Sequence, residues 1–305
     1  MRLLLSPLLF LLLLLPTTVP HAFASDGSLE INQACATQTG CFPGDALGFP
    51  VTITAPGSYR LTSSLGLSLA LPGQTQSVNF IEIRASDVSI DLAGFRISCV
   101  RPLVAERCSG TGSGIRSFAV RTPAVRNGIV SGMGAEGIVF GEAGVVTNVR
   151  VSDSGSTGIV VGEGGRIQEC TVFRNEEGIR TGLAAFVANN AVSRNVETGI
   201  VVQGGVRVVG NSVSLNGGDG IFAEDEVHVA DNTVWDNFGN GIVASGRTTV
   251  ERNQVSNSSG FGLSLNGALY RDNTITTNSS GAVSGGTNLG GNYCEGTNVS
   301  ASTCP

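Results

Sequence analysis

The sequence predicts an all-β protein built as a parallel solenoid. Three observations predict it: a repeat of about 21 residues, three short β-branched stretches in each repeat, and recurring columns of asparagine. A glycine followed by an aliphatic residue recurs from Gly137 to Gly281, with spacings of 21, 20, 21, 21, 21, 21 and 19 residues. Steps this regular indicate a stack of equivalent coils rather than one globular core.

Each repeat has the length and composition of one coil. Three β-branched stretches separated by Gly or Asn can pair with the coils before and after, so three parallel sheets are expected. No stretch shows a period of 3.6 residues, and Gly, Val and Asn are poor helix formers, which excludes helical repeats. A leucine-rich repeat would need a Leu framework that the sequence lacks.

Two asparagine columns keep the same step. We expect them at the bends of the coil, where stacked amides can bond from coil to coil and where Asn tolerates a left-handed backbone. In the earlier repeats Val149 and Cys170 occupy the first column, so Cys170 is expected to be a buried, inert thiol. The first column is Asn190, Asn211, Asn232, Asn253 and Asn273, and the second is Asn175, Asn195, Asn216, Asn237 and Asn278.

Three features of the sequence are typical of one known family. They are the NxVxxNxxxGI units from Asn190 to Leu263, the two asparagine columns, and the leading segments PGSYRLTSSL (56–65) and FIEIRASDVSIDLAGFRIS (80–98). They resemble the right-handed parallel β-helix repeat proteins of the pectate-lyase-like superfamily, over about residues 50–293. The resemblance implies a right-handed parallel β-helix solenoid of about ten rungs with three parallel sheets and capped ends. Enzymes of that superfamily act on polysaccharides in a groove along the first sheet, using carboxylates, Ca²⁺ and a basic Arg or Lys.

The two ends of the chain are expected to differ from the repeats. Arg2, a short apolar run and a small-residue site ending at Ala24 are typical of a secretory signal peptide, so a secreted or periplasmic protein without a membrane span after cleavage is expected. The ends of a solenoid expose strand edges and apolar core, which caps must cover. The expected segments are a signal peptide at 1–24, an N-terminal cap at 25–50, the β-helix at 51–292 and a disulfide-tied tail at 293–305.

Six of the seven cysteines form pairs that are close in sequence. Local disulfides are expected in an oxidising compartment, although six cysteines allow 15 connectivities and the sequence does not choose among them. The irregular stretch 99–114 is expected to be an inserted loop tied by its own pair. The candidate pairs are Cys35 with Cys41, Cys99 with Cys108, and Cys294 with Cys304.

The net charge of the chain limits the classes of partner that it can bind. The chain has a formal net charge of −6 and no Lys, so it lacks the clustered cations that phosphate binding requires, and no nucleic-acid partner is expected. No DxDxDG loop supports Ca²⁺, and no cofactor is expected. The polygalacturonase-type and DPH-type motifs are absent, and a Lys base is excluded, although an Arg base is not.

The best candidates for a site lie around the strand that follows each repeat glycine. The residue before each glycine alternates between acid and neutral polar side chains, and acids two rungs apart, at about 10 Å, could serve an inverting hydrolysis. Repulsion between stacked acids explains the same alternation, and we prefer that explanation. The residues proposed for substrate binding are Glu177, Arg180, Asp219, Asn240 and, as a sugar-stacking platform, Trp235.

The outward residue of the same strand forms a mostly aliphatic stripe. Such a stripe can stack along the sheet, or a loop, a partner or a second copy can cover it, so self-association through it is one expectation. The acidic run Glu224–Glu226 falls in the turn after this strand and is interpreted as a solvated turn, and His228 is interpreted as a surface residue. The stripe is Val139, Val160, Val201, Phe222 and Val243.

Two classes of function stay open. A non-catalytic exported protein that presents an extended face to a polysaccharide or a cell-envelope component is favoured, because the repeats from Gly137 to Asn278 lack the long loops that wall a catalytic groove. The alternative is a carbohydrate-active enzyme: a polysaccharide lyase or epimerase with an Arg base, or a glycoside hydrolase with two carboxylates. A self-associating adhesin or coat element is a third interpretation. No catalytic residue is assigned.

Overall fold

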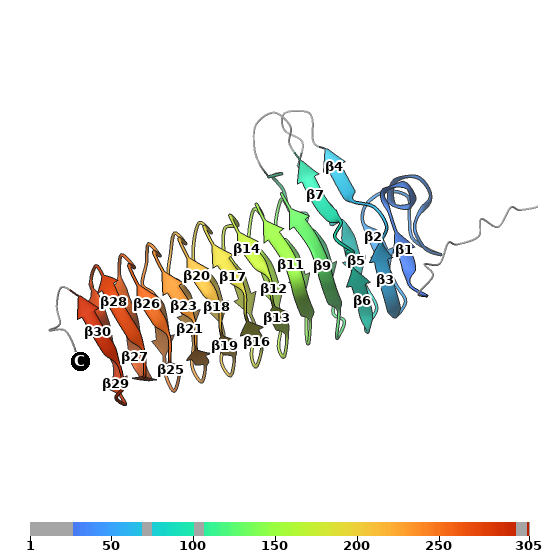
Figure 1. The fold of residues 1–305 in the computed structure, drawn as a ribbon. Helices are drawn as coiled ribbons and strands as arrows, with labels where there is room; N and C mark the ends of the chain where they lie inside the picture. Colours follow the sequence, from blue (N-terminus) through green and yellow to red (C-terminus); the bar gives the residue numbers. More distant parts are fainter. Residues whose placement is uncertain (1–26, 69–74, 101–106, 297–303, 305) are drawn as a thin grey trace, which may run out of the picture.

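The chain winds into a parallel β-solenoid of three ladders (Figure 1), as the repeat predicts. The computed structural model describes residues 27–68, 75–100, 107–296 and 304, so the expected signal peptide lies outside the described residues. Each strand pairs in parallel with strands one coil earlier and one coil later. Ile138 pairs with Ile159, for example, and Ile159 pairs with Ile179.

The first ladder contains the strands that follow the repeat glycines. The glycines recur because the backbone of the next coil lies too close for a side chain. A Cβ on Gly220 would lie 2.6 Å from the carbonyl oxygen of Gly241 on the next coil and 2.5 Å from Val234 Cγ1. The strands of this ladder are β2 (Val51–Ile53), β5 (Ile81–Ile83), β8 (Ile115–Ser117), β10 (Ile138–Phe140), β12 (Ile159–Val161), β15 (Ile179–Thr181), β18 (Ile200–Val202), β21 (Ile221–Ala223), β24 (Ile242–Ser245), and the first parts of β27 (Phe261–Arg271) and β29 (Gly281–Asn288).

The second and third ladders complete each coil. The second holds β1 (Leu29–Ile31), β3 (Gly57–Leu61), β6 (Val88–Asp91), β13 (Arg166–Gln168), β16 (Phe186–Ala188), β19 (Arg207–Val209), β22 (His228–Ala230) and β25 (Thr249–Glu251). The third holds β4 (Leu65–Ser68), β7 (Arg96–Val100), β14 (Thr171–Phe173), β17 (Ala191–Ser193), β20 (Ser212–Ser214), β23 (Thr233–Trp235), β26 (Gln254–Ser256), β28 (Thr274–Asn278) and β30 (Tyr293–Gly296). Strands β9 (Ala124–Ser131) and β11 (Val145–Ser152) bend from the second ladder into the third.

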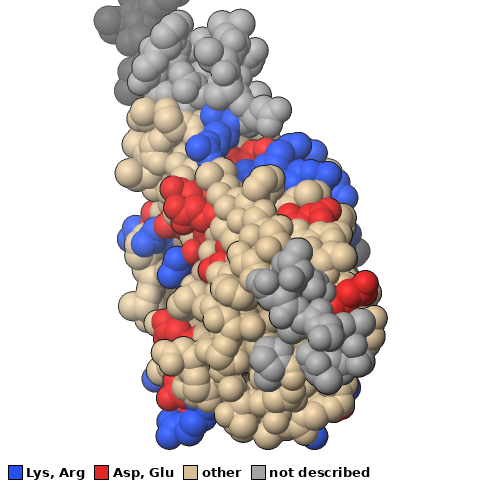
Figure 2. Space-filling model, turned by 90° about the vertical axis from the view of Figure 1, so that its left-hand side faces the viewer, with Lys and Arg blue, Asp and Glu red and all other residues tan. Residues whose placement is uncertain are grey.

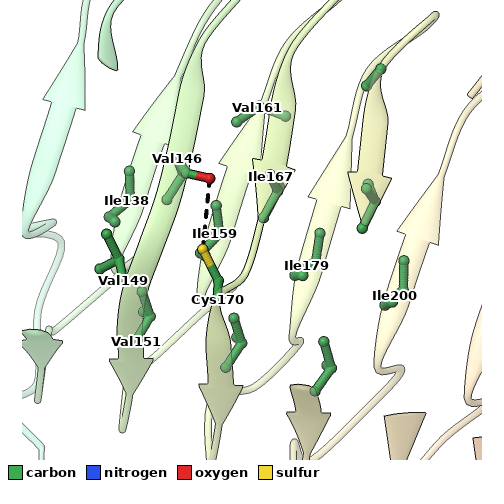
Figure 3. Close-up of a cluster of buried hydrophobic side chains, with 14 of the residues drawn as sticks. Ile138, Val146, Val149, Val151, Ile159, Val161, Ile167, Cys170, Ile179 and Ile200 are labelled. Atoms are coloured by element: carbon green, nitrogen blue, oxygen red, sulfur yellow. Dashed lines mark hydrogen bonds between the residues drawn. The ribbon is translucent and has the colours of Figure 1, made fainter. Parts of the chain in front are cut away.

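The core is a continuous column of aliphatic side chains inside the three ladders (Figure 3). Successive inward residues of the first ladder, such as Ile159, Ile179 and Ile200, are completely buried. Burying one such side chain stabilises the fold by about 1.5–3 kcal/mol. Each coil contributes several, so the interior explains why short strands of three residues hold together.

Both asparagine columns form the expected ladders. Asn211 Oδ1 accepts hydrogen bonds from the backbone N–H and the Nδ2 of Asn190, at 3.0 and 2.9 Å. One part of the expectation is wrong: the ladder residues are not left-handed. The left-handed residue is the preceding one, as at Gly210 (φ 69°) and Leu215 (φ 57°), and the ladder amide points inward. Buried hydrogen bonding, not backbone strain, therefore selects asparagine.

Cys170 fills an asparagine slot, as expected. It is a buried free thiol, and its backbone N–H donates to Asn190 Oδ1 at 2.9 Å. Its Sγ lies 3.7 Å from the carbonyl oxygen of Val146 (Figure 3). Burial raises the pKa of the thiol to about 11. A protonated thiol is a poor nucleophile, so this residue contributes packing rather than reactivity.

Polar side chains satisfy the strand edges at the N-terminal end. Asp45 Oδ1 accepts the backbone N–H of Thr52 at 2.8 Å, at the edge of the first ladder. At the edge of the third ladder, the Gln33 amide accepts from the N–H of Gly66 at 2.8 Å and donates to its carbonyl at 3.2 Å. The second ladder is covered by β1, which pairs with β3. The predicted disulfide Cys35–Cys41 ties this segment, which includes the short π-helix η1 (Cys35–Thr39).

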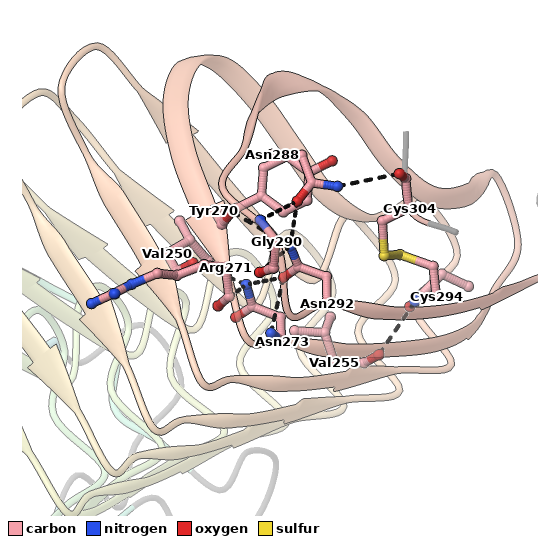
Figure 4. The surroundings of a disulfide bond; sticks show 11 residues. Val250, Val255, Tyr270, Arg271, Asn273, Asn288, Gly290, Asn292, Cys294 and Cys304 are labelled. Atoms are coloured by element: carbon pink, nitrogen blue, oxygen red, sulfur yellow. Dashed lines mark hydrogen bonds between the residues drawn. A yellow bond between two sulfur atoms is a disulfide. The ribbon is translucent and has the colours of Figure 1, made fainter. Parts of the chain in front are cut away.

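The C-terminal end is closed by an extension of the first asparagine ladder (Figure 4). Asn292 Oδ1 accepts from the backbone N–H of Asn273 at 2.9 Å, and Asn288 Nδ2 donates to the Cys304 carbonyl at 3.2 Å. The predicted disulfide Cys294–Cys304 forms here, and Cys99–Cys108 ties the inserted loop. Figure 2 shows that uncharged side chains dominate this end and that charged ones lie around its sides.

Candidate functional site

The outer surface of the first ladder carries most of the predicted site residues. We call it the first-ladder face: the outward side chains of this ladder and the residues just before and after its strands. The predicted stripe is in register, because Val160 pairs with Arg180, which in turn pairs with Val201. The stripe is not flat. A hollow of about 260 Å³ lies at its middle, and its lining includes Val160, Arg180, Val201, Gln203 and Glu224.

Arg180 and Glu177 form a two-pronged ion pair beside this hollow. Arg180 Nε donates to Glu177 Oε1 at 2.9 Å, and its Nη2 donates to Oε2. Glu177 is 4% exposed, whereas Arg180 is exposed. Burial raises the pKa of Glu177 above its ordinary value, although the Arg180 guanidinium acts in the opposite direction. Both carboxylate oxygens are occupied, so this acid is held in place rather than offered to a substrate.

Asp219 and Asn240 lie on neighbouring coils and bond to each other. Asp219 Oδ1 accepts from the backbone N–H of Asn240 at 2.7 Å and from its Nδ2 at 3.0 Å. Asn240 Oδ1 in turn accepts from the backbone N–H of Phe261 at 2.9 Å. These hydrogen bonds form a short polar side-chain ladder, separate from the two asparagine ladders, that stabilises the bends before successive strands of the first ladder. Its signal in the sequence is the step of 21 residues between Asp219 and Asn240.

Two Arg–Glu pairs at the N-terminal part of this face were not predicted. Arg84 Nη2 lies 2.7 Å from Glu82 Oε2, and Arg116 Nη1 lies 3.8 Å from Glu136 Oε2. The guanidinium groups of both arginines lie near the ring of Phe118, which is 42% exposed, with Cζ-to-centroid distances of 6.0 and 5.4 Å. The register β5–β8–β10 extends the stripe to these residues, but the 99–114 insertion hides it in the sequence.

Trp235 lies on the third ladder, away from the other candidates. Its ring is 37% exposed, and its neighbours in register are Ser214 and Ser256. The structure therefore brings Glu177 to Arg180 and Asp219 to Asn240, but it does not join Trp235 to either pair.

The acidic turn and His228 have partners on the next coil. Arg247 Nη2 lies 3.1 Å from Asp225 Oδ2 and 2.5 Å from Glu226 Oε1. His228 Nε2 lies 3.0 Å from Oε1 of the nearly buried Glu251, a carboxylate that the sequence analysis did not single out. In the part of the chain that the structure describes, no group of three or more His, Cys, Asp or Glu side chains is arranged to hold a metal ion.

Glu251 has three side-chain partners: His228 and two arginines. Arg271 Nε donates to its Oε2 at 2.7 Å, and Arg252 Nη1 donates to Oε1 at 2.5 Å. Burial acts to raise the pKa of Glu251, but hydrogen bonds from His228, Arg271 and Arg252 lower it to about 2. The carboxylate is therefore ionised at neutral pH and is fully engaged.

A family model described as a right handed beta helix region matches residues 136–299, which is more than half of the chain. The chain belongs to this family. The fold is accordingly a right-handed parallel β-helix, as the repeat pattern and the resemblance predict. Among curated proteins, no sequence is similar enough to be matched.

Solved structures with similar folds share little sequence with this β-helix protein. The A-module of the mannuronan C-5 epimerase AlgE4 of Azotobacter vinelandii is 16% identical, with a TM-score of 0.62 over 74% of this chain and 71% of that chain. The periplasmic alginate epimerase AlgG is 15% identical, with a TM-score of 0.53 over 88% and 83%. Pectate lyase Pel9A is 12% identical, with a TM-score of 0.54 over 84% and 77%. At these identities the likeness concerns the fold alone.

No helix among the described residues is both long enough and apolar enough to cross a membrane.

Proposed function

We propose that this β-helix protein binds an extended, uncharged polysaccharide along the first-ladder face and does not turn it over. The supporting observation is that three arginines of this face are neutralised by carboxylates, and one of them, Arg180, lines the hollow beside Val160 and Val201. Arg84, Arg116 and Arg180 each lie within 4.0 Å of a glutamate. The proposed partner is thus a linear glycan or a cell-envelope component that contains one.

Glu177 and Asp219 are engaged in contacts within the protein, which argues against a catalytic role for these two carboxylates. A general acid or base needs a free proton-transfer position within hydrogen-bond reach of the substrate. Arg180 holds both oxygens of Glu177, and the backbone of the next coil holds Oδ1 of Asp219. The bends that flank the hollow are short, so no loop walls off a water-excluding groove here.

The charge balance of the face favours a neutral ligand. Beyond the three Arg–Glu pairs, Asp219, Glu197 and Glu224 have no arginine within 4.0 Å among the described residues. The face therefore carries excess negative charge, and an acidic polymer would be repelled. A neutral sugar can place its C–H surface on Val160, Val201 and Phe222 and its hydroxyls on polar side chains at the rim.

Matched substitutions on one coil test the site. Val201 and Val209 are both half-buried and outward-facing, one on the first ladder and one on the second. We expect Val201→Glu to reduce retention on a panel of neutral linear polysaccharides in affinity electrophoresis by tenfold or more, and Val209→Glu to leave it unchanged. Equal losses in the two variants, or none in either, would contradict the proposed site.

Assays for products test the absence of turnover. Reducing-end release and absorbance at 235 nm from unsaturated uronates are followed over neutral and acidic polysaccharides, with and without Ca²⁺. No product is expected. Turnover that disappears when both Arg180→Ala and Asp219→Asn are introduced would overturn the non-catalytic proposal.

A carbohydrate-active enzyme is the second candidate, and the fold of two epimerases and a lyase favours it. In that case Arg180 would be the base and Glu177 the group that positions it. The same product assays separate the two candidates.

Export fits either candidate. Three disulfides are typical of proteins that fold in an oxidising compartment, which supports the proposed secreted or periplasmic location.

A further inference from the structure

The outer surface of the second ladder carries a different arrangement of arginines. Arg166, Phe186 and Arg207 occupy one outward position on three consecutive coils, because Phe186 pairs in register with both arginines. We call these three residues the Arg–Phe–Arg column. Successive rungs are about 4.8 Å apart, which separates the backbones of the two arginines by about 10 Å.

The arginines of this column carry uncompensated charge. Both side chains are exposed, and neither has a carboxylate within 4.0 Å among the described residues. Arg166 Nη1 makes only a long hydrogen bond of 3.4 Å to the Gln168 amide oxygen, and its guanidinium lies 5.0 Å from the centre of the Phe186 ring. In a chain with a net charge of −6, this column is a local positive site.

The surroundings keep the column open and its charge distinct. The next outward residue on β16, two positions after Phe186, is the small and buried Ala188, which adds no charge beside the column. Glu163 and Glu169 lie at the two bends of the coil that contains Arg166, outside ion-pair distance of the column. On the coil after that of Arg207 the same outward position holds His228, which contacts the Glu251 carboxylate. Glu251 also pairs with Arg252 and Arg271, so the column of unpaired arginines does not continue beyond Arg207.

We propose that the Arg–Phe–Arg column binds an acidic polysaccharide. Carboxylates of the polymer pair with Arg166 and Arg207, and the intervening sugar ring lies on Phe186. A guanidinium recognises a carboxylate through two parallel N–H donors, and an aromatic ring offers an apolar platform for a sugar. A linear column of outward side chains on successive coils matches a linear polymer.

Binding to polygalacturonate, measured by affinity electrophoresis at about 50 mM salt, tests this site, since at this ionic strength exposed charges are only partly screened. Its fully methyl-esterified form is the neutral control. We expect the Arg166→Ala/Arg207→Ala variant to lose tenfold or more in affinity, and Phe186→Ala to lose severalfold while Phe186→Tyr retains binding. The esterified polymer is expected not to bind at this column.

Arg150→Ala, compared with Arg166→Ala alone, is the matched charge control, because Arg150 is also exposed and lies on the third ladder without a carboxylate partner among the described residues. An equal loss in Arg150→Ala would show that net charge alone matters and would overturn the proposal. Undiminished binding in the double variant would also overturn it. Val201→Glu on the first ladder is expected to leave polygalacturonate binding unchanged, so this site and the neutral-glycan site can fail separately.

Discussion

The first-ladder face and the Arg–Phe–Arg column share coils, but their arginines differ in whether a carboxylate pairs with them. Arg180 follows Glu177 by three residues, so one bend brings the carboxylate to its guanidinium, at 2.9 Å. Arg166 has Val145 and Phe186 as its rung neighbours, and neither can neutralise it. The fold fixes the position of every outward residue, and the residue on the next rung or in the adjacent bend decides whether its charge is available.

A solenoid separates its faces from one another in a way that a globular core does not. Each coil contacts only its neighbours, so a change on one ladder reaches another ladder only through the shared interior. Ligand specificity on the two faces can therefore differ, with a neutral glycan on one and an acidic glycan on the other.

The asparagine framework is shared by both faces, so its loss is expected to have the largest effect. Asn211 accepts the backbone N–H of Asn190 and donates to the carbonyl oxygen of Val187 at 3.0 Å. Asn211→Ala leaves these buried groups without partners, and we expect the free energy of unfolding to fall by about 3–5 kcal/mol. Binding on both faces should weaken together.

Thermal and denaturant unfolding followed by circular dichroism measures this loss. Ser212→Ala is the control, since Ser212 is the exposed next residue. A stability for Asn211→Ala within 1 kcal/mol of the parent protein would show that the ladder amides are dispensable.

The second prediction compares two acids, one on each face. The pKa of Glu251 is lowered to about 2, so its ionised form stabilises the fold above its ordinary pKa, and this contribution is lost as the pH falls from about 4.5 towards 2. Glu251→Gln should lower the free energy of unfolding at pH 7 by about 1–2 kcal/mol, after allowance for solvent screening. The difference from the parent protein should vanish near pH 2.

Glu177 should show the opposite trend. Burial raises its pKa, so its protonated form favours the folded state at low pH, and that contribution is lost as the pH rises through its folded pKa. Stability curves of the two Gln variants between pH 2 and 7 that run parallel to each other would contradict both assignments.

The framework was predictable because its residues recur. Gly220, Ile221, Asn232 and Asn237 each belong to a column, and a column reports burial or a ladder without any structure. Glu251 was not predictable in this way. It stands in a column with Val209 and Ala230, and its partners come from the coil before, the same coil and the coil after.

The candidate site was predicted as residues but not as contacts. The period identified Asp219 and Asn240 as column neighbours. The structure adds that the two residues are hydrogen-bonded to each other. Phe118 was missed because the insertion before it interrupts the period, and its place on the face follows only from its position directly after β8, which pairs with β5. Periodicity assigns a position to a side chain, and contacts between coils depend on what the neighbouring position happens to hold.

The Glu177–Arg180 ion pair is expected to set the charge preference of the first-ladder face by a small amount. Glu177→Gln removes the partner of Arg180 and should give the first-ladder face an available arginine like those of the Arg–Phe–Arg column. We expect polygalacturonate to bind this variant two- to threefold more tightly in the Arg166→Ala/Arg207→Ala background, because one freed guanidinium can pair with one carboxylate. The stability should change by no more than about 1 kcal/mol, since Arg180 is solvent-exposed.

Glu197→Gln controls for net charge, because Glu197 is exposed, interacts electrostatically with Glu177 and has no ion pair among the described residues. The same gain in Glu197→Gln would mean that the charge of the whole face, not the pairing of Arg180, sets its preference. A gain confined to Glu177→Gln would mean that a single buried carboxylate keeps the two faces of one coil chemically different.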